Sequence, residues 1–527
     1  MSIVSFQFWL FAAAVTLLYF VVPKKGQWIV ILCGNVFFYA FAGVWPLVLM
    51  LATSLIAFLS ALRLENAAEI SAKALPAIGD REIRTEARKS LTSMKKYICG
   101  VAALSVGGVW AVLKYADFFT KNVNRVLGLI NGAWQLPAVS WVLPLGISFY
   151  TFHIIGYVVD VYRGKYPAER NFARFFTFVS FFPHMIQGPF TRFNELGKSI
   201  FGQHRFSYDR LSGGCARILW GLVKKLIIAD RLGVMVHLVF QNFQDYSGFH
   251  ILFAMLGYCV ELYADFSGYM DIVCGLSHIW GIALPENFQQ PYFARSVEEF
   301  WRRWHMTLGQ WVKDYVFYPV SMGKVGQKLG RAARKKWGAR MGKLVPGYFA
   351  LIFVWTATGL WHGANWTYLV WGYLNLFVIM LSMQLGNFYE KAKKACHIRS
   401  EGWAWQLFSM VRTFLLVCFF RFFSSQPSVS YAFATLRHTF AHLNFAGMGS
   451  LKALFAGMSL TEIYVVLAGV LALLAVDILR EKQLWEKVSG KCPMIVRTLC
   501  YAVMILLLVL LVGGSTDLTR GFMYANF

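Results

Sequence analysis

His362 is the residue of this chain that is best placed to do chemistry. It lies in residues 359–366 (GLWHGANW), with apolar residues before it from about 344 and after it to about 385. An ionisable side chain inside such a hydrophobic hairpin is costly in lipid, so it usually faces a cavity or a partner. A neutral imidazole there would suit a general base. If the helix continues, Asn365 lies one turn on and could donate to a developing oxyanion. A histidine that only hydrogen-bonds across packed helices is the alternative.

A second histidine, His305, ends the stretch FWRRWH. Trp301, Trp304 and His305 have the i, i+3, i+4 spacing that places three side chains on one face of a helix. Arg302 and Arg303 would then point elsewhere and could bind the phosphates of a ligand that stacks on the tryptophans. An interfacial belt of aromatic residues with snorkelling arginines explains the same pattern, and both interpretations stay open.

Other kinds of site find little support in the sequence. There is no P-loop, no GxGxxG after a strand, no GxSxG and no HExxH. His438 and His442 have the i, i+4 spacing of metal ligands, but no carboxylate or cysteine lies nearby in the sequence, so no metal site and no bound cofactor are predicted.

The elements that must hold the two histidines are membrane helices. The chain has 527 residues, of which 57% are hydrophobic and 15% charged; a soluble domain has about 25% charged residues. The long apolar runs predict an all-α polytopic membrane protein with roughly eleven to fourteen membrane helices and re-entrant segments. Two of these helices, at about 344–361 and 365–385, form the hairpin around His362. We expect residues 1–527 to form a single membrane-embedded domain.

The distribution of charge predicts the sidedness of the loops. The formal net charge is +25, and the basic residues gather in short segments between apolar runs, which is the positive-inside pattern and not that of a nucleic-acid-binding protein. Loops near 63–96 and 323–343 are therefore expected in the cytoplasm, where the basic residues would also favour anionic lipid head groups. The loop near 425–458 has few charges and is expected outside.

At these motifs the sequence resembles the membrane-bound O-acyltransferase family, and within it the bacterial alginate O-acetyltransferase branch. The resemblance covers most of the chain, and its clearest segments are 143–152 (LPLGISFYTF), 265–271 (DFSGYMD), 285–288 (PENF), 300–305 (FWRRWH), 311–315 (WVKDY), 359–366 (GLWHGANW) and 521–527 (GFMYANF). His153 departs from the pattern, because a glutamine is expected there. Residues 317–323 also depart from the family's usual YIPLGG.

The resemblance implies a fold, a reaction and a set of roles. The expected fold is a helical rim around a central tunnel. His362 is the expected essential histidine and His305 the supporting one. Substrate contacts are expected from Asn365, Trp361, Trp304, Arg302, Arg303 and Asp314.

The implied reaction moves an acetyl group from a cytoplasmic thioester, acetyl-CoA, across the plasma membrane of a bacterium. The acceptor would be an extracellular or cell-wall polysaccharide, reached through a secreted or membrane-anchored partner that resembles an SGNH-type acetylesterase. D-alanyl transfer to teichoic acid from a carrier protein is the alternative within the family. A transporter or lipid flippase is the alternative of another class. It would predict internal repeats and more intramembrane charge than the sequence contains.

Overall fold

The computed structural model describes residues 1–130, 134–139, 141, 143–445 and 449–512. Their regular secondary structure is helical, apart from one isolated bridge between Phe288 and Trp304. The prediction of an all-α protein is therefore confirmed. The segment 521–527, which contributes to the family resemblance, lies outside the described residues.

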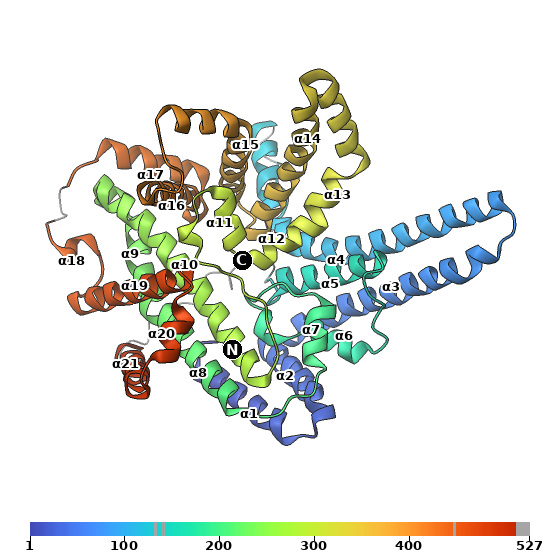
Figure 1. Ribbon diagram of the computed structural model, residues 1–527, viewed down its shortest axis with the longest axis horizontal. Helices are drawn as coiled ribbons and strands as arrows, with labels where there is room; N and C mark the ends of the chain where they lie inside the picture. Colours follow the sequence, from blue (N-terminus) through green and yellow to red (C-terminus); the bar gives the residue numbers. More distant parts are fainter. Residues whose placement is uncertain (131–133, 140, 142, 446–448, 513–527) are drawn as a thin grey trace. The chain divides into compact units, whose positions relative to one another are not determined.

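The chain forms two compact units (Figure 1). The first comprises Met1–Gly214 and Val273–Pro285; the second comprises Cys215–Ile272 and the chain from Glu286 onward. The first unit contains α1 (Phe6–Val21), η1 (Lys24–Gly26), α2 (Gln27–Ala42), α3 (Val44–Ala77), α4 (Arg81–Ile130), α5 (Ile147–Tyr162), α6 (Phe172–Val179), η2 (Phe182–His184), α7 (Phe193–Ile200) and the start of α8 (Tyr208–Leu222).

The second unit carries both histidines singled out above. Its elements are a π-helical segment η3 (Val223–Ala229), α9 (Asp230–Gln241), η4 (Phe243–Asp245), most of α10 (Gly248–Trp280), η5 (Pro291–Phe293), α11 (Val297–Arg303), α12 (Met306–Val312), a second π-helical segment η6 (Lys313–Phe317), α13 (Tyr318–Ser321), α14 (Lys324–His362), α15 (Trp366–Ala395), α16 (Trp403–Ser425), α17 (Val429–Ala441), α18 (Leu451–Leu454), α19 (Leu460–Glu481), α20 (Trp485–Lys491) and α21 (Met494–Val512).

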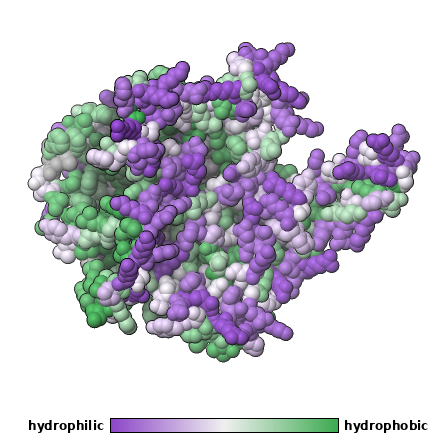
Figure 2. All heavy atoms as spheres, in the orientation of Figure 1, coloured by the Kyte–Doolittle hydropathy of each residue, from purple (hydrophilic) through white to green (hydrophobic). Residues whose placement is uncertain are grey.

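Eight described helices are long and apolar enough to cross a membrane, or nine if the bent pair α20–α21 counts as one span. With two shorter apolar helices, α1 and α5, the described residues contain ten or eleven candidates, at or just below the lower end of the expected range. Large hydrophobic side chains are exposed along several of these helices, as lipid-facing surfaces require. On α21, for example, Leu499, Val503 and Leu506 are exposed, and hydrophobic atoms cover this helix in Figure 2.

The sequence predicts a loop for the polar segment 63–96, but this prediction is wrong: the segment consists of the ends of two helices. α3 and α4 run side by side as a long hairpin whose turn is residues 78–80 (Figure 1). Asp80 begins α4, since its carboxylate accepts hydrogen bonds from the backbone amides of Glu82 and Ile83. The segment is rich in Ala, Glu, Lys and Arg, which are strong helix formers. Its polarity thus reports exposure to solvent and not the absence of helix; its cytoplasmic location stays a prediction.

The basic segment 323–343 is also helical. α14 is broken at Gly338, which has a positive φ of 84°, and the chain then folds back on itself. A Cβ atom at Gly330 would lie 2.8 Å from Pro346, which shows how closely the two limbs approach. All eight Lys and Arg side chains of this basic arm (residues 324–343) are exposed, and hydrophilic atoms cover it in Figure 2. The segment 425–458 is likewise built largely from α17 and α18; residues 446–448 lie outside the described part of the chain.

His153, which departs from the family pattern, has a packing role in the first unit. Its Nδ1 lies 2.9 Å from the carbonyl oxygen of Phe149, and its Nε2 accepts from the backbone amide of Thr191 at 3.2 Å. Its ring stacks on that of His184 at 4.3 Å. The imidazole therefore ties α5 to the chain around residues 184–191.

Candidate functional site

His362 is the last residue of α14, and the helix does not continue past it. The backbone of Gly363 is extended, and Asn365 begins α15. The Asn365 side chain accepts from the amide of Thr367 at 3.1 Å and donates to the carbonyl of Pro427 at 2.9 Å. The prediction that Asn365 lies one helical turn beyond His362 is wrong, because its amide caps the next helix and ties it to the chain that precedes α17.

Two glycines allow α14 and α15 to close tightly around the histidine. A Cβ atom at Gly359 would lie 2.8 Å from the carbonyl oxygen of Tyr368, and one at Gly363 would lie 2.1 Å from the Tyr368 ring. This packing places the Tyr368 ring 6.4 Å from the ring of His362, with the ring of Trp371 at 4.9 Å, edge to face. His362 itself is only 2% exposed.

His305 lies outside any helix. α11 ends at Arg303, Trp304 is extended, and His305 has a left-handed backbone with a φ of 48°. The prediction that Trp301, Trp304 and His305 share one helical face is therefore wrong. A left-handed conformation is costly for a side chain such as histidine and persists only where the surroundings enforce it.

Asn287 enforces this turn. Its backbone carbonyl accepts from the amide of Met306 at 3.0 Å. Its side-chain oxygen accepts from the amide and the hydroxyl of Thr307, at 3.1 and 2.9 Å, and lies 3.2 Å from Nδ1 of His305. Because an amide oxygen can only accept, Nδ1 carries the proton, and the neutral ring has its lone pair on Nε2. Burial, together with the guanidinium of Arg421, lowers the pKa of His305 to about 3, which favours this neutral form.

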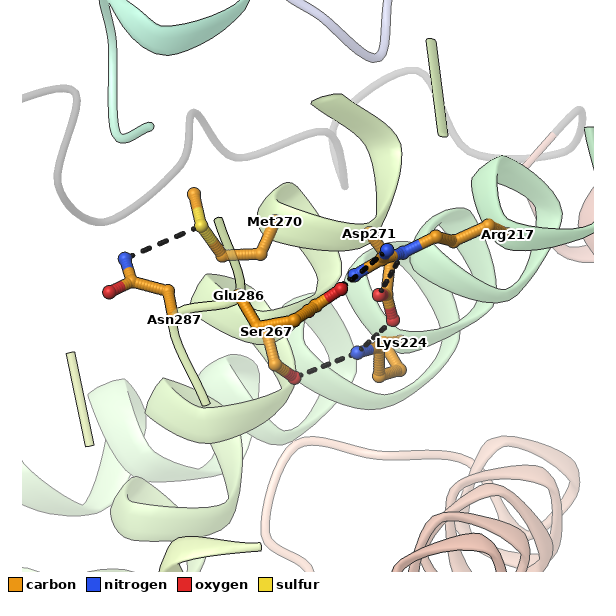
Figure 3. A network of polar contacts seen from close by, with 7 residues as sticks. All are labelled: Arg217, Lys224, Ser267, Met270, Asp271, Glu286 and Asn287. Atoms are coloured by element: carbon orange, nitrogen blue, oxygen red, sulfur yellow. Dashed lines mark hydrogen bonds and ion pairs between the residues drawn. The ribbon is translucent and has the colours of Figure 1, made fainter. Parts of the chain in front are cut away.

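An ion-pair network holds the segment that carries Asn287 (Figure 3). Arg217 bridges Asp271 at 2.9 Å and Glu286 at 2.7 Å, and Lys224 binds the other oxygen of Asp271 at 2.6 Å. The network thus ties Glu286, the residue that precedes Asn287, to α8 and α10. Asp271 thus forms ion pairs with two cations at once.

Aromatic rings connect the two histidines. The ring of Trp361 lies 6.0 Å from that of His305 and 4.9 Å from that of His362. The Trp371 ring, which contacts His362, lies 5.5 Å from the ring of Trp301. The structure thus places His362, His305 and Trp361 next to one another, and Trp304 directly precedes His305 in the chain; their roles stay predictions.

The three other predicted residues are placed differently. Arg303 forms ion pairs with Glu299 at 2.8 Å and Glu481 at 2.7 Å, so its charge is already compensated. Arg302 is exposed and pairs with Glu298 at 2.8 Å. Asp314 accepts a hydrogen bond from Gln310 at 2.9 Å.

Two cavities of the second unit approach the histidines. One, of about 640 Å³, is lined by His305, Trp301, Trp304, Arg302 and Lys313, with apolar walls from α14 and α15. We call it the tryptophan cavity. The other, of about 990 Å³, is called the polar cavity. Its lining is rich in hydroxyl, amide and charged side chains, among them Asp230, Asp265, Asn365, Thr367, Tyr368, Gln426 and Tyr431. The ring of His362 neighbours that of Tyr368, which lines the polar cavity. The ring of Trp361 separates His362 from His305, which lines the tryptophan cavity.

Arg421 is a residue of this site that sequence analysis missed. It lies on α16, is 4% exposed, and its guanidinium carbon is 5.4, 5.1 and 4.7 Å from the ring centres of Trp301, Trp304 and Trp371. A signal was available, because an arginine within an apolar run is a functional candidate by the same argument that selected His362. Asn287 was also missed, although it lies in one of the family motifs.

The fold and the site define a multi-pass, all-α membrane protein with two buried histidines, one lining a cavity and the other next to aromatic residues near two cavities. Residues 168–333 match the model of MBOAT, the membrane-bound O-acyltransferase family, and the chain belongs to that family. The matched range includes His305 and ends before His362.

Three relatives illustrate the similarity. A protein named "Probable alginate O-acetylase" from Azotobacter vinelandii is 38% identical over 264 residues, which is 50% of this chain and 49% of that protein. The peptidoglycan O-acetyltransferase of Helicobacter pylori is 29% identical over 398 residues, covering 70% and 66% of the two chains. The teichoic acid D-alanyltransferase of Bacillus subtilis is 31% identical over 356 residues, covering 62% and 86%. This chain spans about half the length of the alginate O-acetylases that it matches.

Proposed function

We propose that this protein is an O-acyltransferase of a bacterial plasma membrane. It moves an acetyl group from a cytoplasmic thioester, acetyl-CoA, towards an extracellular or cell-wall polysaccharide. The observation that carries this proposal is the position of buried His362, whose ring neighbours Tyr368 of the polar cavity and, through Trp361, His305 of the tryptophan cavity. The relatives support it, since two are named for O-acetyl transfer and one for D-alanyl transfer. Membership of an acyltransferase family favours this function over a transporter or flippase.

The tryptophan cavity suits the thioester donor. Its apolar walls would hold an acyl thioester, and Arg302 and Lys313 at its lining carry positive charge. The basic arm adds eight exposed cations with no acidic residue, which would raise the local concentration of a polyphosphorylated donor such as acetyl-CoA.

The polar cavity suits an acceptor that carries hydroxyl groups. Thr367 and Gln426 are buried, and the hydroxyl of Thr367 and the side-chain oxygen of Gln426 have no hydrogen-bond partner among the described residues. Both residues line this cavity. A sugar hydroxyl, or a serine hydroxyl of a secreted acetylesterase-like partner, would satisfy such groups.

The reaction follows from these positions. His362 accepts the proton of the acceptor hydroxyl while its oxygen attacks the thioester carbonyl. The tetrahedral oxyanion collapses, the carbon–sulfur bond breaks, and the leaving thiolate takes the proton back from His362. The products are an acetyl ester and free CoA thiol, so atoms and charge balance.

The test is transfer of labelled acetyl groups in membranes that contain the protein. His362→Ala should insert normally and lose transfer, because the base is removed. His442→Ala, an exposed histidine of the second unit, is the matched control and should keep it. Transfer at the wild-type rate by a correctly inserted His362→Ala protein would refute the assignment.

D-alanyl transfer is the second candidate, favoured by the 86% coverage of the Bacillus subtilis relative. The two candidates differ in the donor. Binding of CoA by the purified protein supports acetyl transfer, whereas binding of an acylated carrier protein without binding of CoA supports D-alanyl transfer.

A further inference from the structure

Arg421 is a buried cation without an anion. No carboxylate forms an ion pair with it among the described residues, and one of its terminal nitrogens, Nη2, is buried with no hydrogen-bond partner there. Its guanidinium is surrounded by the faces of Trp301, Trp304 and Trp371. Cation–π attraction offsets only part of the cost of burying an unpaired charge. A residue retained at such a cost to folding points to a role outside stability.

The position of Arg421 relates it to both histidines. One of its ring partners, Trp371, contacts His362, and another, Trp304, directly precedes His305 in the chain. Trp301 and Trp304 also line the tryptophan cavity. The positive charge is therefore one aromatic ring away from the place where the two substrates would meet.

Several other candidates for stabilising negative charge near this place are already engaged. Asn365 caps α15 and binds Pro427, Arg303 is paired with two glutamates, and Arg302 is exposed and paired with Glu298. Lys224 and Lys225, the buried lysines near α10, are bound to aspartates. Arg421 differs from all of these in having no acidic partner.

We propose that the charge of Arg421 stabilises the oxyanion that forms when the acceptor hydroxyl attacks the thioester. This inference rests on the proposed acyl transfer. The charge acts across the tryptophan rings in a water-poor interior, where a fixed cation interacts more strongly with a developing anion than it would in water. Arg421 thus acts through its electrostatic field, without touching the reacting atoms, and is neither a base nor a nucleophile. It should affect the transition state more than the binding of the donor.

The experiment compares Arg421→Met, Arg421→Gln and Arg421→Lys in proteoliposomes of the full chain, with acetyl-CoA as donor and release of CoA thiol as readout. Arg421→Met and Arg421→Gln should lower kcat about tenfold, since the charge acts from one ring away, and leave KM for acetyl-CoA within about threefold of wild type. Arg421→Lys should recover part of kcat because it keeps the charge. Arg412→Met is the control: Arg412 is a partly exposed arginine of the same helix that bonds to Tyr389 and to the backbone carbonyl of Arg295, and its replacement should keep the wild-type kcat.

Thermal stability separates this role from a structural one. Because Arg421 has no anionic partner, neither neutral variant should have a lower thermal midpoint than wild type. A lower midpoint or lost insertion in both neutral variants, or a kcat within about twofold of wild type, would overturn the inference. So would equal losses in Arg421→Lys and Arg421→Met. If the wild-type protein itself releases no CoA thiol, the proposed function is refuted. If the wild type is active but the neutral variants keep its kcat or lose stability, only the role of Arg421 is refuted.

Discussion

Asn287→Ala should damage both the stability and the activity of this protein, although Asn287 is not expected to touch either substrate. The substitution removes the side-chain oxygen that accepts from the Thr307 amide and faces the Nδ1–H of His305. Each buried N–H left without a partner costs about 1–3 kcal/mol. Thr307 is only partly buried, so we expect the free energy of unfolding to fall by about 2–4 kcal/mol for the loss of both contacts, those of the Thr307 amide and of the His305 Nδ1–H.

The effect on activity comes from the left-handed turn at His305. Without the Asn287 side chain, the turn at His305 loses the side-chain hydrogen bonds to Thr307 and the contact with Nδ1, while the backbone bond from Met306 to residue 287 is kept. The ring of His305 should therefore shift at the wall of the tryptophan cavity. A misplacement of about 1 Å near the reacting atoms costs roughly 100-fold in rate. The assay is thermal unfolding of the purified protein together with acetyl transfer in proteoliposomes.

Two comparisons make the prediction specific. Asn242→Ala, at an exposed asparagine whose side chain donates to the carbonyl of Leu238 one turn earlier, should leave both readouts unchanged. Asn287→Asp keeps the acceptor and should restore much of the stability, but its negative charge would favour a protonated His305 and keep transfer slow. Unchanged stability and unchanged transfer in Asn287→Ala would refute the reasoning.

Three further predictions concern neighbouring features. Gly363→Ala places a Cβ atom against the Tyr368 ring and should cost about 1–3 kcal/mol and most of the transfer activity, measured by thermal unfolding and acetyl transfer. Asp271→Asn leaves Lys224 buried beside a neutral amide and should cost about 3–5 kcal/mol, whereas Glu286→Gln, at the exposed end of the same network, should cost less than about 1 kcal/mol. The native pKa of about 3 at His305 lies below that of an unfolded histidine, about 6.5. The unfolded chain therefore binds this proton first, so stability falls as pH drops from about 6.5 towards 3, and His305→Gln should reduce that slope in a pH series of unfolding curves.

The hairpin around His362 could be predicted from sequence because it depends on local information. Two apolar runs of membrane-spanning length flank one polar motif. The helix before the motif ends, and the helix after it begins, close to where hydropathy places them, whereas their outer ends at Lys324 and Ala395 lie well beyond the predicted ones. The same hydropathy failed for residues 63–96 and for the basic arm. Polarity shows that a segment avoids lipid, but it does not distinguish a loop from an exposed helix.

The conformation of His305 could not be predicted because contacts distant in sequence determine it. The spacing of Trp301, Trp304 and His305 is typical of a helix, yet the chain turns at His305, where it is bound by Asn287, 18 residues earlier. Asn365 is a similar case, since its amide binds Pro427, 62 residues later. Periodicity describes what a segment would do alone, and here tertiary hydrogen bonds outweigh it.

The charges around the site divide into two groups, and the division has a physical consequence. Asp271 and Lys224 compensate each other, as do Lys225 and Asp265, so these ion pairs fix backbone positions while adding little net field. Arg421 is uncompensated and adds a field of one sign. Such a field opposes a positive charge on His305 and favours a negative charge on a substrate. If acyl transfer proceeds as proposed, Arg421 both keeps His305 neutral and lowers the energy of the oxyanion. The paired charges would then stabilise the fold, and the unpaired charge would promote the reaction.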